Sequence, residues 1–184
     1  PEHLWIQWEP THNPERHDPG LLDKVQAVRI GESTRKLSTL SARVDALHRE
    51  TDNIVSLQLK ALDGKTFPSW AAGAHIDVVC GTTGLARQYS LCGDPSHPDE
   101  WKLAVFQEPN SRGGSKWIHK SVSKGDVLQL RGPRNHFHFD ETAHQVVFIA
   151  AGIGITPLVP MALKAKQLGI DYALHYSGGS RKDM

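Results

Sequence analysis

The feature that most constrains the fold is a change in hydrophobic pattern near residue 143. From about residue 40 up to that point, short alternating apolar segments are separated by Gly, Pro, Asn or Asp, which is typical of antiparallel strands. Beyond it, QVVFIAA (145–151) is a continuous apolar run, as expected of a strand buried on both faces. The chain therefore combines two regions of different architecture.

The first region predicts a six-stranded antiparallel barrel, because closure removes exposed sheet edges. One strand is expected within DNIVSLQLKALDG (52–64), in which Val55, Leu57, Leu59 and Ala61 alternate with polar side chains before an Asp-Gly turn signal. A single helix, SKWIHKSV (115–122), interrupts the strands. The remaining expected strands are 43–48, 75–80, 87–91, 101–107 and 126–131.

The second region predicts a βαβ unit. The apolar strand is followed by GIGITP, by a segment with helical spacing (161–169) and by a second strand, DYALHYS (171–177). Such a unit alone is smaller than a stable domain. We therefore expect an incomplete nicotinamide-type domain over 143–184, a barrel over 40–142, and a linker with the tail of a preceding domain over 1–39.

Composition excludes several classes of protein. Lys plus Arg total 21 against 20 Asp plus Glu, so the net charge of +1 argues against a general nucleic-acid or anionic-membrane binder. The two cysteines cannot form a four-cysteine metal site within this chain, and they indicate a reducing, cytoplasmic compartment. No apolar run reaches the ~20 residues of a membrane span. The absence of an initiating Met suggests a fragment of a larger protein.

The segment RQYSL (87–91) places unusual side chains on a strand. Alternation puts Arg87 and Tyr89 on one face and turns Ser90 away. A guanidinium beside a phenol ring could form a salt-bridged surface, or it could hold a flat anionic ligand.

The segment SRGGSKW (111–117) predicts a phosphate seat. Arg112 precedes Gly113 and Gly114, and Ser115 is expected to cap the helix that follows. Free backbone N–H groups in the first turn of a helix bind phosphate, and glycines allow close approach. An ordinary glycine-rich loop with a satisfied cap is the alternative.

A second glycine-rich turn follows the buried strand. Gly152 and Gly154 precede Thr156, which is expected to cap a helix, and Pro157, which suits its first position. A pyrophosphate above this helix end would meet N–H groups and the positive end of the helix dipole. The third glycine of the Rossmann fingerprint is missing.

The last segment, HYSGGSRKD (175–183), follows the second strand of the βαβ unit. Basic residues there favour a ribose 2′-phosphate, so Ser180, Arg181 and Lys182 favour NADPH. Asp183 opposes this preference, and solvated surface charge is the alternative.

Histidines do not predict a metal site. His136 and His138 are expected to share a strand face, but no third ligand is identifiable. His75 is interpreted as a hydrogen-bonded structural residue rather than a base.

Taken in order, the motifs GAHIDV, RQYSL, AVFQE, SRGGS, GPRNHF and AAGIGITP resemble the ferredoxin–NADP⁺ reductase superfamily. The closer resemblance is to its phthalate dioxygenase reductase branch, whose members bind FMN, and it runs from about residue 40 to 184. The resemblance implies an antiparallel flavin barrel followed by a nicotinamide domain.

The resemblance also implies roles for individual residues. Arg87 would pair with the FMN phosphate or ribityl chain, Tyr89 would stack on the isoalloxazine, and Ser90 would hydrogen-bond near N5, where hydride arrives. Because alternation turns Ser90 away from the ring, the strand must end or twist there, or the backbone N–H of Ser90 makes the contact. Tyr89 and Ser90 are thus the catalytic candidates. The cofactor site would be completed by Gln88, Ala104, Val105, Phe106, Arg112, Gly113, Gly114 and Ser115 around the flavin, and by Gly152, Gly154, Thr156, Pro157, Ser180 and Arg181 around the nicotinamide cofactor.

The family implies an enzyme that takes hydride from NAD(P)H onto FMN and passes single electrons to a [2Fe–2S] domain serving an oxygenase. PEHLWIQWEP (1–10) resembles the last strand of a haem-thiolate cytochrome monooxygenase in self-sufficient fusions, although a Trp-rich linker is equally compatible. We expect the isolated chain to oxidise NAD(P)H poorly. A stand-alone flavin or ferric reductase and a non-catalytic binding or linker module are the alternatives.

Overall fold

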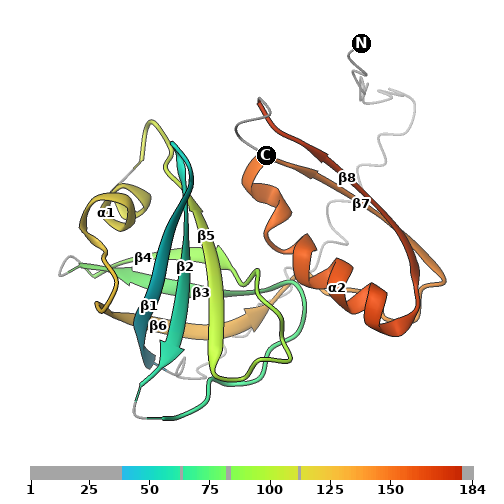
Figure 1. Ribbon diagram of the computed structural model, residues 1–184, viewed down its shortest axis with the longest axis horizontal. Helices are drawn as coiled ribbons and strands as arrows, with labels where there is room; N and C mark the ends of the chain where they lie inside the picture. Colours follow the sequence, from blue (N-terminus) through green and yellow to red (C-terminus); the bar gives the residue numbers. More distant parts are fainter. Residues whose placement is uncertain (1–38, 63, 82–83, 112, 180–184) are drawn as a thin grey trace, which may run out of the picture. The chain divides into compact units, whose positions relative to one another are not determined.

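The computed structural model describes residues 39–62, 64–81, 84–111 and 113–179 (Figure 1). Its elements, in chain order, are β1 (Thr39–Thr51), β2 (Ile54–Ala61), β3 (Ala74–Cys80), β4 (Leu85–Ser90), β5 (Glu100–Phe106), α1 (Gly114–Ser121), β6 (Val127–Asn135), β7 (Gln145–Ala151), a 3₁₀ helix (Gly152–Ile155), α2 (Leu158–Leu168) and β8 (Asp171–Ser177). Residues 1–38, which hold the expected linker and haem-domain strand, lie outside the described residues.

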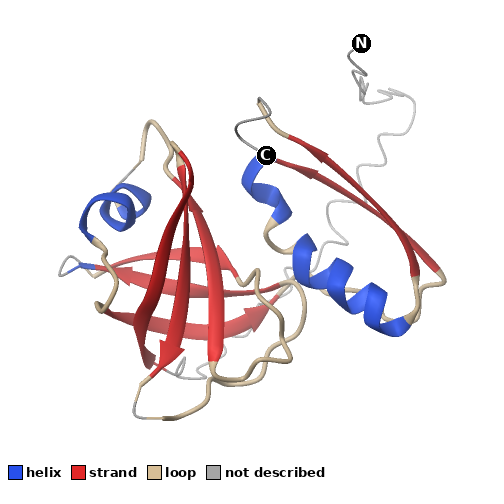
Figure 2. Cartoon of the chain, viewed as in Figure 1, coloured by secondary structure: helices blue, strands red, loops and turns tan. Residues whose placement is uncertain are grey.

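Strands β1 to β6, among the strands drawn in red in Figure 2, form one antiparallel sheet, as expected for the first region. Their order in the sheet is β4-β3-β6-β1-β2-β5. The sheet does not close into a complete barrel, since β4 and β5 remain its two edges. Only an isolated bridge between Leu91 and Leu103 joins these edges among the described residues. The expected full closure is therefore replaced by a partly open barrel.

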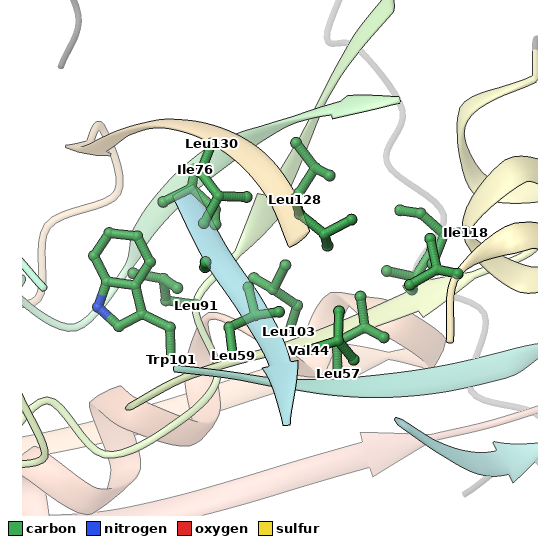
Figure 3. Close-up of a cluster of buried hydrophobic side chains, with 14 of the residues drawn as sticks. Val44, Leu57, Leu59, Ile76, Leu91, Trp101, Leu103, Ile118, Leu128 and Leu130 are labelled. Carbon is green, nitrogen blue, oxygen red and sulfur yellow. The ribbon is translucent and has the colours of Figure 1, made fainter. Parts of the chain in front are cut away.

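The sheet is curved around a core made by the side chains that face inward from each strand. Trp101, Leu57 and Ile76 are fully buried there (Figure 3). Phe67 stacks on Trp101 with ring centroids 4.1 Å apart. Ile118 of α1 closes one side of the same cluster. Alternating apolar residues thus produce this core because successive strand side chains face opposite ways.

The second region is the expected βαβ unit. Strands β7 and β8 pair in parallel, and α2 buries Met161 and Ala165 in a cluster with Phe148. The other face is open among the described residues, since Val147 and Ile149 are 57% and 74% exposed. The expectation that β7 is buried on both faces is therefore wrong here, because α2 covers only one side of the two-stranded sheet.

Two further local expectations are corrected. Strand β6 ends at Asn135, so His136 and His138 lie beyond it and do not share a strand face. Pro160 is the third residue of α2, where the backbone N–H has no helical partner in any case, so it places no strain on the helix. No helix in the described part of the chain is long and apolar enough to cross a membrane.

Candidate functional site

The candidate site lies where the antiparallel sheet is left open, between its edge strands β4 and β5. Both strands carry residues that the sequence predicts to bind a cofactor. The bridge between Leu91 and Leu103 joins the edges at one point, and helix α1 contacts β3, β4 and β5. Edge strands present unpaired backbone groups, so an opening of this kind can accept a ligand between them.

Strand β4 divides the RQYS residues between two faces. Arg87 and Tyr89 pair with Val78 and Ile76, which are fully buried in the core, so their side chains share the inner face. Ser90 pairs with His75 on the opposite face. Burial raises the pKa of the Tyr89 hydroxyl far above its usual range, so this group stays protonated.

Arg87 lies directly against the first residue of α1. A β-carbon added at Gly114 would come 2.5 Å from the Cγ atom of Arg87, so only glycine leaves room for this stem. The Arg87 Nη1 atom donates to the Ala86 carbonyl oxygen at 2.9 Å. A guanidinium carries five N–H donors, so most of its donor capacity can serve an anion at the start of α1.

The first turn of α1 presents backbone N–H groups beside this arginine. The Trp117 N–H donates to the Gly113 carbonyl oxygen at 2.8 Å, which is the first helical bond. The N–H groups of the residues before Trp117 therefore have no partner within the helix. Gly113, with φ of 108°, makes the turn into the helix in a conformation that favours glycine.

Ser115 does not cap α1, which corrects the sequence prediction. The helix begins at Gly114 and has no side-chain cap hydrogen bond, so Ser115 lies inside its first turn. The Ser115 hydroxyl instead donates to Ser111 Oγ at 2.9 Å, and Ser111 Oγ accepts from the Gly113 N–H at 3.2 Å. Ser111, which the sequence did not single out, therefore holds the loop. Arg112 lies outside the described residues.

Strand β5 directs alternate backbone groups towards the opening. The Lys102 carbonyl oxygen accepts from the Cys92 N–H at 2.9 Å, on the side of β4. Alternation places the backbone polar groups of Ala104 and Phe106 on that same side. Val105 faces β2, where it pairs with Val55, and its carbonyl oxygen also accepts a 2.8 Å bond from His119 Nε2.

Ser90 borders a hollow of about 250 Å³ with Tyr89, Gln88, His75 and His136. The rings of His75 and His136 meet edge to face with centroids 5.4 Å apart. Burial, followed by the positive charge of Arg134, lowers the pKa of His75. Its Nε2 atom is buried and has no hydrogen-bond partner in the described structure. His75 is thus brought beside Ser90, a placement that the sequence did not predict.

The second glycine-rich turn differs in detail from its prediction. Gly152 and Gly154 lie in a 3₁₀ helix, and α2 begins only at Leu158, with no side-chain cap. Thr156 is therefore not the helix cap, because its Oγ1 atom donates back to the Ile153 carbonyl oxygen at 2.9 Å. A β-carbon at either glycine would meet no atom within 4 Å. Pro157 immediately precedes α2.

Two further hollows border this turn. One of about 400 Å³ is lined by Thr51, Asn53 and Phe106 together with Gly152. Another of about 450 Å³ is mainly apolar, lies against β7 and includes Gly154. Neither hollow is lined by Arg87 or by the first turn of α1, where the polar groups suited to an anion lie. Ser180 and Arg181 lie outside the described residues.

The described residues contain no group of three or more His, Cys, Asp or Glu side chains that could hold a metal ion. The polar groups at the opening are instead a guanidinium, helix N–H groups and backbone groups at a strand edge. That donor set fits an anionic organic molecule with a flat ring system.

No family model matches the chain. Among curated proteins it is 39% identical over 146 residues to the phenoxybenzoate dioxygenase subunit beta of Ectopseudomonas oleovorans, which covers 79% of this chain and 46% of that protein. It is 38% identical over 133 residues to the vanillate O-demethylase oxidoreductase of Acinetobacter baylyi, covering 72% of this chain and 42% of that protein. The chain thus spans less than half the length of these relatives.

The chain also matches part of the length of longer proteins among solved structures. Full-length CYP116B46 from Tepidiphilus thermophilus matches with a TM-score of 0.78 and 49% identity over 96% of this chain and 24% of that one. An intact type IV self-sufficient cytochrome P450 monooxygenase matches with a TM-score of 0.78 and 46% sequence identity. The match covers 96% of this chain and 23% of that one. Phthalate dioxygenase reductase, described as a modular structure for electron transfer from pyridine nucleotides to [2Fe–2S], matches with a TM-score of 0.76 and 30% sequence identity. The match covers 80% of this chain and 46% of that one.

Proposed function

The chain belongs to the phthalate dioxygenase reductase branch of the ferredoxin–NADP⁺ reductase superfamily, and from this premise we propose that it is the FMN-binding segment of an NAD(P)H-dependent oxidoreductase. The observation that carries the proposal is the contact between Arg87 and Gly114. It brings a cation from β4 to the free N–H groups of α1, at an opening whose other edge is β5. A terminal phosphate fits this combination of charge and helix end.

FMN is proposed rather than FAD because the seat suits a phosphate group that ends the ligand. Gly114 and Ser115 would hold the phosphate through backbone N–H groups, Gly113 would turn the chain into the helix, and Arg87 would neutralise the charge of the phosphate. Arg112 remains part of the proposed seat from the sequence alone. This arrangement explains why two glycines stand where a helix begins.

The ring system would lie along the two sheet edges. Tyr89 offers a half-buried aromatic face on β4. The Ser90 side chain lies on the opposite face of the strand, so Ser90 would contact the ring near the reactive N5 atom through its backbone N–H. The backbone groups of Ala104 and Phe106 face the opening and would meet the polar edge of the ring. Gln88 of β4 is exposed and borders the same hollow as Ser90.

Bound flavin supplies the chemistry, by accepting hydride and releasing electrons singly. The residues of this chain supply position. Ser90 and Tyr89 hold the reacting edge in place, since hydride transfer requires reacting atoms about 3–3.5 Å apart. The protonated Tyr89 hydroxyl adds a donor without adding charge.

We place the nicotinamide cofactor at the second glycine-rich turn. Gly152 and Gly154 leave open space for a ligand backbone, and Thr156 and Pro157 lead into α2. A preference for NADPH, assigned to Ser180 and Arg181, stays a prediction. The domain limits 40–142 and 143–184 likewise stay predictions.

The parent protein would serve an oxygenase. The relatives are named as reductase or oxygenase subunits, and one structural neighbour is a self-sufficient cytochrome P450 monooxygenase. We therefore propose a [2Fe–2S] domain and a haem monooxygenase domain as electron-transfer partners, in the same polypeptide. A cytoplasmic location stays a prediction from the low cysteine count.

The visible absorption spectrum of the purified chain tests this function. We expect a yellow protein, or one that becomes yellow on adding FMN, and chromatography of the released ligand should identify FMN. Release of FAD would leave the superfamily intact but contradict the phosphate seat. A chain that stays colourless after FMN is added would contradict the proposed function.

A further inference from the structure

His119 joins the helix that starts at the phosphate seat to the strand on the far side of the opening. Its Nε2 atom lies 2.8 Å from the carbonyl oxygen of Val105, which is fully buried in β5. A carbonyl oxygen only accepts hydrogen bonds, so Nε2 carries the proton and donates it. The bond links α1 to a residue 14 positions earlier in the chain.

Helix α1 depends on such contacts for its position. It has eight residues, begins with a glycine and lacks a side-chain cap, and isolated helices of this length are marginal in water. Ile118 anchors it through the core, where it is fully buried. Burial of Ile118 fixes the distance of the helix from the core, whereas the directional bond from His119 fixes its position along β5.

The His119 side chain makes no second hydrogen bond within the described residues. Its Nδ1 atom is buried and lacks a hydrogen-bond partner there. The bond to Val105 is therefore the polar contact that sets the orientation of the ring, and its removal would leave α1 held mainly by apolar packing.

Under the proposed function, on which this inference rests, α1 and β5 would bind different parts of the flavin. The first turn of α1, with Gly114 and Arg87, would receive the phosphate. The edge of β5, at Ala104 and Phe106, would receive the ring. The covalent ribityl chain sets the spacing between phosphate and ring, so the protein must hold its two subsites at a matching spacing.

We propose that His119 is a positioning residue that holds the phosphate subsite in register with the ring subsite, and thereby makes the chain select phosphorylated flavin over riboflavin. Pre-organised subsites bind a two-part ligand more tightly because less order is lost on binding. Riboflavin lacks the phosphate and engages only the ring subsite. Loss of the hydrogen bond between His119 and Val105 should therefore weaken FMN binding and leave riboflavin binding nearly unchanged.

The test is a comparison of two ligands on three variants. His119→Leu removes the donor, and His119→Gln replaces it with an amide whose Nε2 can reach a similar position. Lys120→Gln, at the neighbouring exposed position of α1, is the matched control. Fluorescence titration of the flavin-free chain with FMN and with riboflavin gives the ratio of the two dissociation constants.

We expect His119→Leu to weaken FMN binding roughly three- to tenfold, as for loss of one buried hydrogen bond. Riboflavin binding should change less than about twofold, and His119→Gln should restore much of the FMN affinity. Lys120→Gln should leave the ratio at the wild-type value.

Equal weakening of both ligands in His119→Leu would overturn the proposal, because it would indicate a general structural role. An unchanged ratio would overturn it as well. If His119→Leu does not fold, His119→Phe takes its place, because it keeps a ring of similar size but has no donor, and an unchanged ratio in that variant would overturn the proposal. Wild-type chain that binds neither flavin would overturn the proposed function itself.

Discussion

Two glycine-rich turns precede helices in this chain, and they are alike in sequence but different in space. Before α1, the glycine at 114 is required by the chain itself, since a β-carbon there would strike Arg87 at 2.5 Å. Before α2, Gly152 and Gly154 have no atom within 4 Å of such a position. The turn before α1 is packed against the Arg87 side chain, whereas the turn before α2 has open space around its glycines.

The difference separates two uses of glycine. At α1 the missing side chain lets a cation approach the helix end, so the seat is assembled before any ligand arrives. At the 3₁₀ helix the missing side chains leave room that the described chain does not fill. The first turn should therefore control flavin affinity, and the second should affect only nicotinamide binding.

Arg87→Ala should have the largest effect on flavin binding. It removes charge-assisted bonds to the phosphate, and we expect FMN affinity to fall roughly ten- to a hundredfold. Arg131→Ala, which removes an exposed arginine from β6, is the control and should bind normally. Equilibrium titration with FMN measures both, and equal affinity in the two variants would remove Arg87 from the site.

Gly114→Ala should have the next largest effect. The added methyl group overlaps the Arg87 Cγ atom, so the arginine side chain must shift and take its guanidinium away from the helix end. The loss should therefore fall on FMN affinity more than on folding. We expect FMN binding about fivefold weaker, with a small decrease in melting temperature. Normal binding by this variant would mean that the contact is not part of the seat.

Gly154→Ala should leave FMN binding within about twofold of wild type. Because the added methyl group meets nothing, the free energy of unfolding should stay the same or rise by about 0.4–1 kcal/mol. Urea unfolding and FMN titration measure the two quantities. A marked loss of FMN affinity here would erase the distinction between the two turns.

The smallest expected effect concerns His75, beside Ser90. Its lowered pKa means that the unfolded chain takes up the proton more readily, so its contribution to stability is present at neutral pH. That contribution should be lost as the pH falls below about 6.5, the ordinary value for histidine. His75→Gln should flatten this part of the stability profile in urea unfolding at pH 7.5, 6.5 and 5.5. The exposed His48→Gln should retain the wild-type slope.

Local patterns predicted most of the secondary structure correctly because alternation and helical spacing are properties of neighbouring residues. The strand pairing that places Arg87 inward and Ser90 outward followed from the same alternation. Sheet closure was not predictable in this way, because it depends on whether β4 and β5 pair. In the described part of the chain they are joined only at the isolated bridge of Leu91 with Leu103 and the adjacent hydrogen bond from Cys92 to Lys102.

The misassigned helix caps have a similar cause. Helix α1 begins one residue earlier than expected, which moves Ser115 into its first turn, and α2 begins later, which leaves Thr156 outside it. Such shifts depend on tertiary contacts that the sequence does not display. The bond between His119 and Val105 also joins separate elements, so no local signal could reveal it.

The most direct measurement is the change in backbone amide NMR signals of the ¹⁵N-labelled chain as FMN is added. The largest shifts should fall on three segments, 87–90, 104–106 and 113–116, because these surround the opening between β4 and β5. Riboflavin should shift the first two segments and spare the third. Shifts confined to β7 and α2, or no shifts at all, would contradict the placement of the flavin at this opening.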